Sequence, residues 1–210
     1  MEKFELSDRK APPQGKITFE EFLAWADEDT HAEWEDGEVV MVSPASRRHQ
    51  ELVLWLSKVL GFYIEERDLG WLTNVPFLIQ LHATRQGREP DLLFLKTENM
   101  HRLQETYLDG PADLVIEVVS PESVSRDRGS KFVEYESEGI PEYWLLDPTR
   151  QQAEFYRLGG DNRYRLYPPD EEGVYHSLSI SGFWLKAEWL WQDPLPKTRQ
   201  VWRQLGILEG

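Results

Sequence analysis

The stretch Asp113-Leu114-Val115-Ile116-Glu117-Val118-Val119 is nearly continuous apolar sequence, with Gly110-Pro111 before it and Ser120-Pro121 after it. Such a run between turn residues is typical of a central strand that is buried on both faces of a sheet. Glu117 is the exception in this strand, because burying a lone carboxylate is costly unless it is paired or bound to a metal ion. Strand alternation places Glu117 on the same face as Val115 and Val119.

A second acid, Asp91, follows Pro90 and opens the apolar segment Asp91-Leu92-Leu93-Phe94-Leu95. We expect this segment to be the strand next to 113–119, so that Asp91 and Glu117 enter one pocket. Two carboxylates in a pocket form a hard, oxygen-lined site of the kind that Mg²⁺ or Mn²⁺ prefers. The alternative is structural: Asp91 caps a turn and Glu117 pairs with an arginine.

The remaining segments alternate helical and strand patterns. Thr18 and Glu21 form a capping box that starts a helix ending near Ala26, and Asp36-Gly37 is a favoured hairpin turn. The other expected elements are a helix at 47–66, strands at 71–81 and 90–95 joined by a polar loop at 85–87, a helix at 126–138 ended by Gly139, a strand at 143–146 and a hairpin at 155–167. The pattern predicts one α/β (α+β) domain, with a mixed central sheet flanked by helices and an additional N-terminal helix and hairpin.

We divide the 210 residues into a flexible N-terminal arm (1–16), the domain itself (17–196) and a C-terminal tail (197–210). The chain has no cysteine, which excludes disulfides, thiolate zinc sites and cysteine nucleophiles. Its first residues are too polar for a signal peptide, and no apolar run approaches the roughly 20 residues that span a bilayer. A soluble, cytoplasmic protein without a membrane segment is expected.

The net charge of −15 argues against tight nonspecific binding of DNA, because neutralising phosphates supplies much of that affinity. Small basic clusters nevertheless lie beside the candidate acids. Arg47 and Arg48, with His49, lie in the first turn of the helix at 47–66, where anions are favoured. Arg126 and Arg128 form a second basic cluster, and Arg128 is a further candidate phosphate contact. For His49 the alternative is structural, because a histidine at a helix start more often makes only a structural hydrogen bond.

Several stretches, taken in order, resemble one large bacterial family. They are Asp36-Gly37-Glu38, Ser43-Pro44 with His49-Gln50, Pro90-Asp91, 113–121 and Gly139-Ile140-Pro141-Glu142-Tyr143-Trp144. This ordered set resembles the Uma-two family of bacterial restriction endonucleases, within the superfamily that carries the Pro-Asp…(Asp/Glu)-x-Lys signature. The resemblance covers about 17–190 and implies a restriction-endonuclease-like core with metal-dependent cleavage of DNA.

The chain departs from the superfamily signature at one position. The lysine expected two residues after Glu117 is Val119, which cannot stabilise the charge of a reacting phosphate. Some members of the superfamily carry the lysine on the next helix, and Lys131 is the candidate there. Asp127, Lys131 and Tyr135 share a helix face at i,i+4 spacing, so this face could point toward the carboxylates. The alternative for Lys131 is an ordinary surface ion pair with Asp127.

The resemblance also implies an acid from the N-terminal part of the core. Glu33 and Glu38 flank the first hairpin turn and are both candidate metal ligands; the sequence does not decide which one faces the site. The leading hypothesis is a Mg²⁺-dependent (or Mn²⁺-dependent) endonuclease on DNA that acts as a homodimer, with Asp91, Glu117 and Lys131 as catalytic residues. The alternatives are a noncatalytic binding module with the nuclease fold, and a nuclease that acts on RNA or branched DNA.

Overall fold

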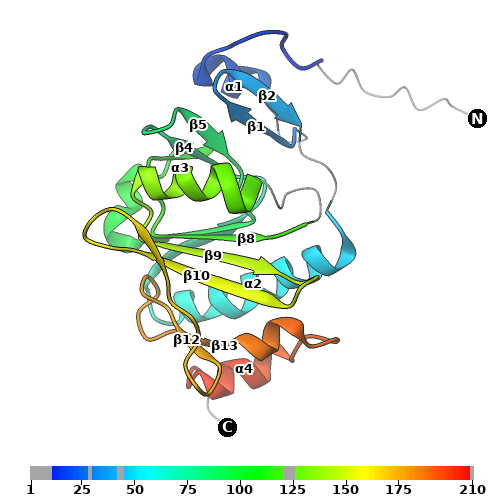
Figure 1. Cartoon of the computed structure of the whole chain (residues 1–210), viewed down its shortest axis with the longest axis vertical. Coiled ribbons are helices and arrows are strands. Elements are labelled where there is room, and N and C mark those ends of the chain that lie inside the picture. Colours follow the sequence, from blue (N-terminus) through cyan, green and yellow to red (C-terminus); the bar gives the residue numbers. More distant parts are fainter. Residues whose placement is uncertain (1–10, 28–29, 42–44, 121–125, 209–210) are drawn as a thin grey trace, which may run out of the picture.

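The central strand lies inside a six-stranded sheet (Figure 1). The computed structural model describes residues 11–27, 30–41, 45–120 and 126–208. The strands are β1 (Ala32–Glu35), β2 (Glu38–Met41), β3 (Gly70–Asn74), β4 (Leu78–Leu81), β5 (Gln86–Arg88), β6 (Leu92–Lys96), β7 (Tyr107–Asp109), β8 (Leu114–Val118), β9 (Glu142–Asp147), β10 (Gln152–Leu158), β11 (Tyr164–Leu166), β12 (Val174–His176) and β13 (Trp184–Lys186). The helices are α1 (Phe19–Trp25), α2 (Arg47–Glu65), the 3-10 helix η1 (Thr97–Arg102), the π-helical turn η2 (Arg126–Ser130), α3 (Lys131–Glu138), the 3-10 helix η3 (Ala187–Trp191) and α4 (Thr198–Gln204).

The six-stranded sheet has the order β11-β10-β9-β8-β6-β3, with β8 parallel to β9 and antiparallel to β6. Helix α2 covers one face of this sheet, because its apolar stripe packs against the even-numbered side chains of β6 and β8. That core contains Leu56 and Val59 of α2 together with Phe94 and Ile116. Since both faces of β8 are covered, its near-continuous apolar sequence is explained.

A five-stranded sheet and α3 cover the opposite face. This second sheet has the order β2-β1-β5-β4-β7. Ile79 of β4 and Tyr135 of α3 join the core formed by Val115, Val119 and Tyr143 of the six-stranded sheet. Residues of β8 with odd numbers, including Glu117, therefore point into the layer between the two sheets.

The β1–β2 hairpin forms one edge of the five-stranded sheet, and α1 packs against it. Phe19 and Phe22 of α1 pack on Trp34, and Thr18 and Glu21 make both hydrogen bonds of the predicted capping box. The hairpin turns at Asp36-Gly37, as expected. Strand β1 pairs with β5 through Trp34 and Glu35, which attaches the hairpin to the rest of the molecule.

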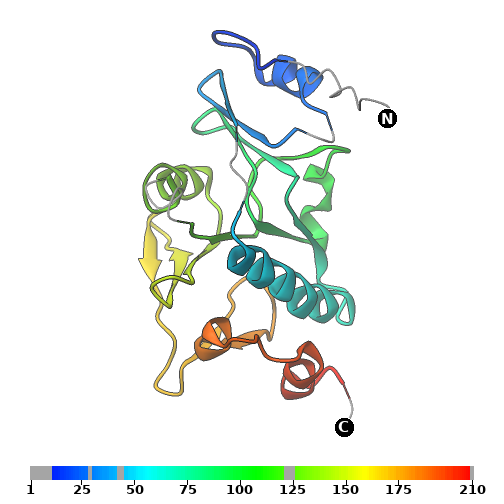
Figure 2. The ribbon, with the colours of Figure 1, turned by 90° about the vertical axis from the view of Figure 1, so that its right-hand side faces the viewer.

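The C-terminal segment packs beneath α2, as Figure 2 shows in orange and red. Helix α4 lies within the stretch that the sequence suggests is a tail. Its Val201, together with the adjoining Leu205, is buried in the same core as α2, and Trp202 donates a hydrogen bond from Nε1 to the Val59 carbonyl. None of the helices in the described ranges has the length and apolar character needed to cross a membrane.

The predicted α/β class with a mixed sheet is confirmed, but the prediction of one strand over 71–81 is wrong. The chain leaves the six-stranded sheet after Asn74 and enters the five-stranded sheet at Leu78. Pro76 lies between them and has no N–H to offer a neighbouring strand, which favours a break there. The loop expected at 85–87 is also different, since Gln86–Arg88 forms β5 between β1 and β4.

We predict that Leu205→Ala destabilises the protein by about 2–4 kcal/mol, because it removes buried methylene groups from the core shared with α2. Chemical denaturation provides the measurement. The matched control is Gln204→Ala, an exposed neighbour that we expect to change stability by less than about 0.5 kcal/mol. Equal effects of the two changes would show that α4 contributes no core packing.

Candidate functional site

Glu117 is buried between the two sheets and receives two hydrogen bonds. Its Oε1 accepts one from Lys131 Nζ at 3.0 Å and one from the Tyr135 hydroxyl at 2.8 Å. Both donors lie on α3, one turn apart, on the helix face that the i,i+4 spacing indicates. The carboxylate of the central strand is thus paired, as its burial requires.

Lys131 lies at the centre of an acidic cluster. Its side chain is 7% exposed, and Nζ is 2.9 Å from Glu33 Oε1, 3.0 Å from Glu117 Oε1 and 3.9 Å from Asp127 Oδ1. The alternative of an ordinary surface ion pair is excluded by this burial. Helix α3 thus brings the Lys131 amine to the Glu117 carboxylate. Val119, at the signature position for lysine, has no amine.

The acidic surroundings keep Lys131 protonated. Burial lowers its pKa, but the three carboxylates around it raise it by more, so the amine is an ammonium ion at neutral pH. Burial also raises the pKa of Glu117 above its ordinary value, with the carboxylates of Asp127 and Asp91 adding to the rise and Lys131 opposing it. For Glu33, burial raises the pKa, but Lys131 and Arg88 lower it by more, so this carboxylate stays ionised.

Asp91 is held at the edge of the same layer. Its Oδ2 accepts a hydrogen bond from the Val118 N–H at 2.6 Å and lies 3.1 Å from Nε2 of His49. Burial lowers the pKa of His49, but the hydrogen bond and charge of Asp91, the charge of Asp127 and the Val118 backbone together raise it by more. Helix α2 starts at this point, where Ser46 caps it by accepting a hydrogen bond from the His49 N–H. His49 thus binds Asp91, and Asp91 contacts the backbone next to Glu117.

Arg88 joins three acidic side chains at the back of the cluster. Its guanidinium donates from Nη1 to Glu33 Oε2 at 3.0 Å and to Glu35, and from Nε and Nη2 to the two oxygens of Glu134 at 2.7 Å each. Glu89, next in the chain, also borders the cluster, and its pKa is raised to about 8 by burial and by Glu33.

The structure places the other predicted residues as follows. Glu33 faces the cluster, whereas Glu38 is exposed and lies near Lys16. Arg47 is exposed and pairs with Glu51, and Arg48 donates to the Leu190 carbonyl at 2.8 Å. These contacts do not join the Glu117 cluster.

Arg128 is directed to strands β9 and β10, where it pairs with Glu154 and, at 3.5 Å, with Asp147. Arg126 is different. It lies close enough to Glu33 to lower the pKa of that carboxyl, and the ion pairs of the described residues do not include it. Of the two arginines of η2, only Arg126 therefore keeps an uncommitted guanidinium near the acids.

The side chains around Glu117 fit a divalent ion in their chemistry. They are carboxylates, which are the donors that Mg²⁺ prefers, and three of them, Glu33, Glu117 and Asp127, surround the single ammonium of Lys131. Within the described ranges, no three acidic or histidine side chains are placed so that together they could hold one metal ion. Asp91 and Glu117 would therefore supply two ligands and leave the others to water and substrate, as Mg²⁺ commonly accepts.

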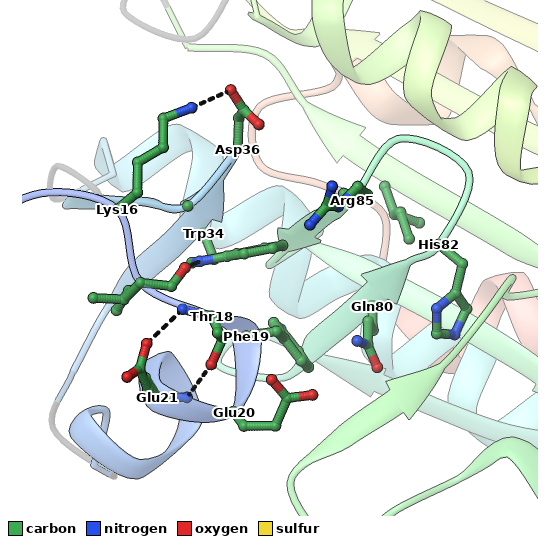
Figure 3. A pocket seen from close by; sticks show the side chains of 13 residues that line it. Lys16, Thr18, Phe19, Glu20, Glu21, Trp34, Asp36, Gln80, His82 and Arg85 are labelled. Atoms are coloured by element: carbon green, nitrogen blue, oxygen red, sulfur yellow. Dashed lines mark hydrogen bonds and ion pairs between the residues drawn. The ribbon is translucent and has the colours of Figure 1, made fainter.

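A cavity of about 620 Å³ lies elsewhere, on the outer side of the five-stranded sheet (Figure 3). Trp34 lines it, and Glu33 points to the opposite side of β1 because successive strand residues alternate. The ion pair of Lys16 with Asp36 and the capping residues of α1 occupy its rim. None of the carboxylates of the Glu117 cluster lines this cavity, so the cavity is separate from the candidate site.

Sequence reasoning misses two buried partners of the acids, Arg88 and Glu134. Tyr135 had a sequence signal, since it is four residues after Lys131 on the helix face that the spacing predicts, and its hydroxyl contacts Glu117. Arg88 and Glu134 had none, because their pairing depends on β5 joining β1 and on α3 packing over both strands.

We predict that Lys131→Met destabilises the protein by about 3–5 kcal/mol at neutral pH, because it leaves buried carboxylates without their cation. Denaturant unfolding measures the loss. Adding Glu117→Gln to this variant should recover part of the stability by removing one unpaired charge. The control is Lys58→Met, an exposed change on α2. A loss no larger than the control's would mean that the ammonium does not balance this cluster.

The comparisons with known proteins agree with this fold. Residues 19–188 match the Uma2 family, described as "Putative restriction endonuclease". The uncharacterized protein slr1290 of Synechocystis sp. is 26% identical over 173 residues, which cover 80% of this chain and 90% of the relative. The uncharacterized protein sll1609 of the same organism is 24% identical over 152 residues, covering 71% and 85%.

A solved structure shares the fold. It is the crystal structure of a protein from Anabaena variabilis described as a putative nuclease belonging to DUF820, with a TM-score of 0.70 and 17% identity over 83% of this chain and 97% of that one. The family match spans the central strand, both candidate carboxylates, Lys131 and the hairpin that carries Glu33. This chain belongs to the Uma2 family of restriction-endonuclease-like proteins.

Proposed function

We propose that this protein is a metal-dependent endonuclease that hydrolyses phosphodiester bonds of DNA. The observation that carries the proposal is the position of Lys131 Nζ, 3.0 Å from Glu117 Oε1 and 2.9 Å from Glu33 Oε1. A buried ammonium ion beside two carboxylates supplies the positive charge that phosphate cleavage needs and that Val119 does not offer.

Each residue has a distinct role in this proposal. Asp91 and Glu117 would hold Mg²⁺ or Mn²⁺, which when bound polarises a phosphoryl oxygen and supplies a hydroxide nucleophile. Lys131 stabilises negative charge on the scissile phosphate; since it is already protonated, it is not the base that deprotonates water. His49 orients Asp91, and Tyr135 orients Glu117 through its hydroxyl.

The family description supports the endonuclease reading, and DNA is the substrate that it suggests. We further propose that the protein acts as a homodimer in the cytoplasm. Two cuts on opposite strands call for two sites related by a twofold axis, and a chain without cysteine fits a reducing compartment.

Two observations favour a second function, a binding module with the nuclease fold that does not cleave. The net charge of −15 disfavours affinity for phosphates, and three arginines near the site, Arg48, Arg88 and Arg128, are committed to internal hydrogen bonds. The two functions differ in one measurable property, which is turnover of a nucleic acid in the presence of a divalent ion.

We predict that the protein cleaves plasmid or oligonucleotide DNA with Mg²⁺ or Mn²⁺ and is inactive in EDTA. Asp91→Asn, Glu117→Gln and Lys131→Met should each lower the rate by on the order of 100-fold or more, because the first two weaken binding of the metal ion and the third removes positive charge at the phosphate. Gel assays with duplex DNA, branched DNA and RNA define the substrate.

Glu98→Gln is the matched control, since it neutralises an exposed carboxylate outside the cluster. Cleavage that survives both Asp91→Asn and Glu117→Gln overturns the metal-site assignment. A folded wild type that cleaves none of the substrates but binds one of them establishes the binding module instead.

We predict that Arg126, more than Arg128, contacts the DNA phosphates. Arg126→Ala should weaken binding of a duplex oligonucleotide and lower the slope of log affinity against log salt by about 1. Arg128→Ala should leave that slope unchanged and lower the melting temperature, because it breaks the pairs with Glu154 and Asp147. Fluorescence anisotropy at several salt concentrations, in the Glu117→Gln background, measures binding without cleavage. Equal slopes for the two variants contradict the assignment.

A further inference from the structure

Arg88 is the largest buried charged side chain of the molecule's described part, with 1% of its surface exposed. It touches no residue proposed to bind metal or phosphate except Glu33. Its five N–H groups are arranged as a rigid planar fork, and the structure uses the two sides of that fork differently. One side binds both oxygens of Glu134 on α3, and the other binds Glu33 and Glu35 on β1.

Glu33 divides its two oxygens between two cations. Oε2 accepts from Arg88 at 3.0 Å, and Oε1 lies 2.9 Å from Lys131 Nζ. Because Arg88 occupies Oε2, the rotation of the carboxylate is fixed and Oε1 faces the ammonium. Lys131 in turn lies 3.0 Å from Glu117 Oε1, so the orientation of Glu33 is passed on to the candidate site.

The contacts close a ring. Glu134 and Lys131 are three residues apart on α3. Lys131 contacts Glu33 of β1 directly, whereas Glu134 is joined to the same strand through Arg88. A movement of α3 relative to β1 therefore breaks two charged contacts at once. Neither Glu134 nor Arg88 reaches Glu117, so their effect on the site passes through Glu33 and Lys131.

We infer that Arg88 is a positioning residue that sets Glu33, and through it the Lys131 ammonium, against Glu117. The effect on cleavage rests on the proposed nuclease function, whereas the effect on Lys131 does not. A lysine in place of Arg88 offers a single point charge and does not span Glu134 and Glu33 together. Arg88→Lys therefore keeps the charge and loses the geometry, and Arg88→Met loses both.

The first test measures how accessible the Lys131 amine is. An amine-acylating reagent is added to the folded protein, and the labelling rate of each lysine is measured by mass spectrometry, with the exposed Lys58 and Lys197 as internal references. In the wild type Lys131 should label slowly, because it is buried and held by two carboxylates. Arg88→Met should raise its rate several-fold relative to Lys58, and Arg88→Lys should give an intermediate rate.

The control for general loosening is Leu205→Ala, which weakens the core on the far side of the six-stranded sheet without touching this ring. Unchanged Lys131 labelling in the Arg88 variants, or an equal rise in Leu205→Ala, overturns the inference. If Arg88→Met does not fold, Arg88→Lys alone decides between the outcomes.

The second test measures cleavage. Arg88→Met should lower kcat by on the order of 100-fold with little change in KM, because the charge on α3 is misplaced while the substrate surface is intact. In the Lys131→Met background the same change should cause no further loss, since Arg88 acts through that lysine. A full additional loss contradicts this route. If the wild type cleaves nothing, the proposed function fails, and the labelling result still decides the role of Arg88.

Discussion

The arrangement of this protein depends on the burial of one carboxylate in the middle of a central strand. Glu117 lies among apolar neighbours on β8, and a charge in that position needs a partner that comes from outside the strand. Lys131 supplies it, and the ammonium is in turn too deeply buried to be balanced by Glu117 alone, so Glu33 and Asp127 surround it. Ion pairs thus join the three elements of the site, because Lys131 on α3 contacts Glu117 on β8 and Glu33 on β1.

This dependence explains where the basic residues lie. In many nucleic-acid-binding proteins arginines gather on a surface that faces the phosphates. Here Arg88 and Arg128 pair with buried or half-buried acids, and Arg48 binds a carbonyl of the C-terminal segment. These three arginines stabilise internal contacts, whereas Arg126 takes part in no ion pair of the described residues. A divalent ion would consequently contribute more to substrate attraction than in a nuclease with a basic surface.

The sequence predicted the elements whose signals are local. The capping box at Thr18, the hairpin at Asp36-Gly37, the helix from Arg47 and the buried strand with Glu117 all follow from neighbouring residues, and each is confirmed. The placement of Lys131 near Glu117 could also be predicted, because the helix spacing puts Lys131 on the same face as Asp127 and Tyr135.

Other features depend on which strands become neighbours, and single-sequence patterns do not contain that information. The choice between Glu33 and Glu38 required the pairing of β1 with β5, and the role of His49 required the distance from α2 to Asp91. The segment 71–81 carries apolar residues on both sides of Pro76, and this concealed a change of sheet there, since its two halves pair with different strands. Metal binding by Asp91 and Glu117 stays a prediction, as does the division into arm, domain and tail.

The pairing of β1 with β5 also bears on when this molecule becomes competent. Glu117 belongs to the six-stranded sheet, Lys131 to α3, and Glu33 and Arg88 to the five-stranded sheet, so the cluster is complete only when all three pack together. A chain whose six-stranded sheet has folded before the N-terminal hairpin docks lacks Glu33 beside Lys131, so its charge cluster is incomplete. The charge cluster is therefore a property of the assembled fold, because it is complete only once the hairpin that carries Glu33 has paired with β5.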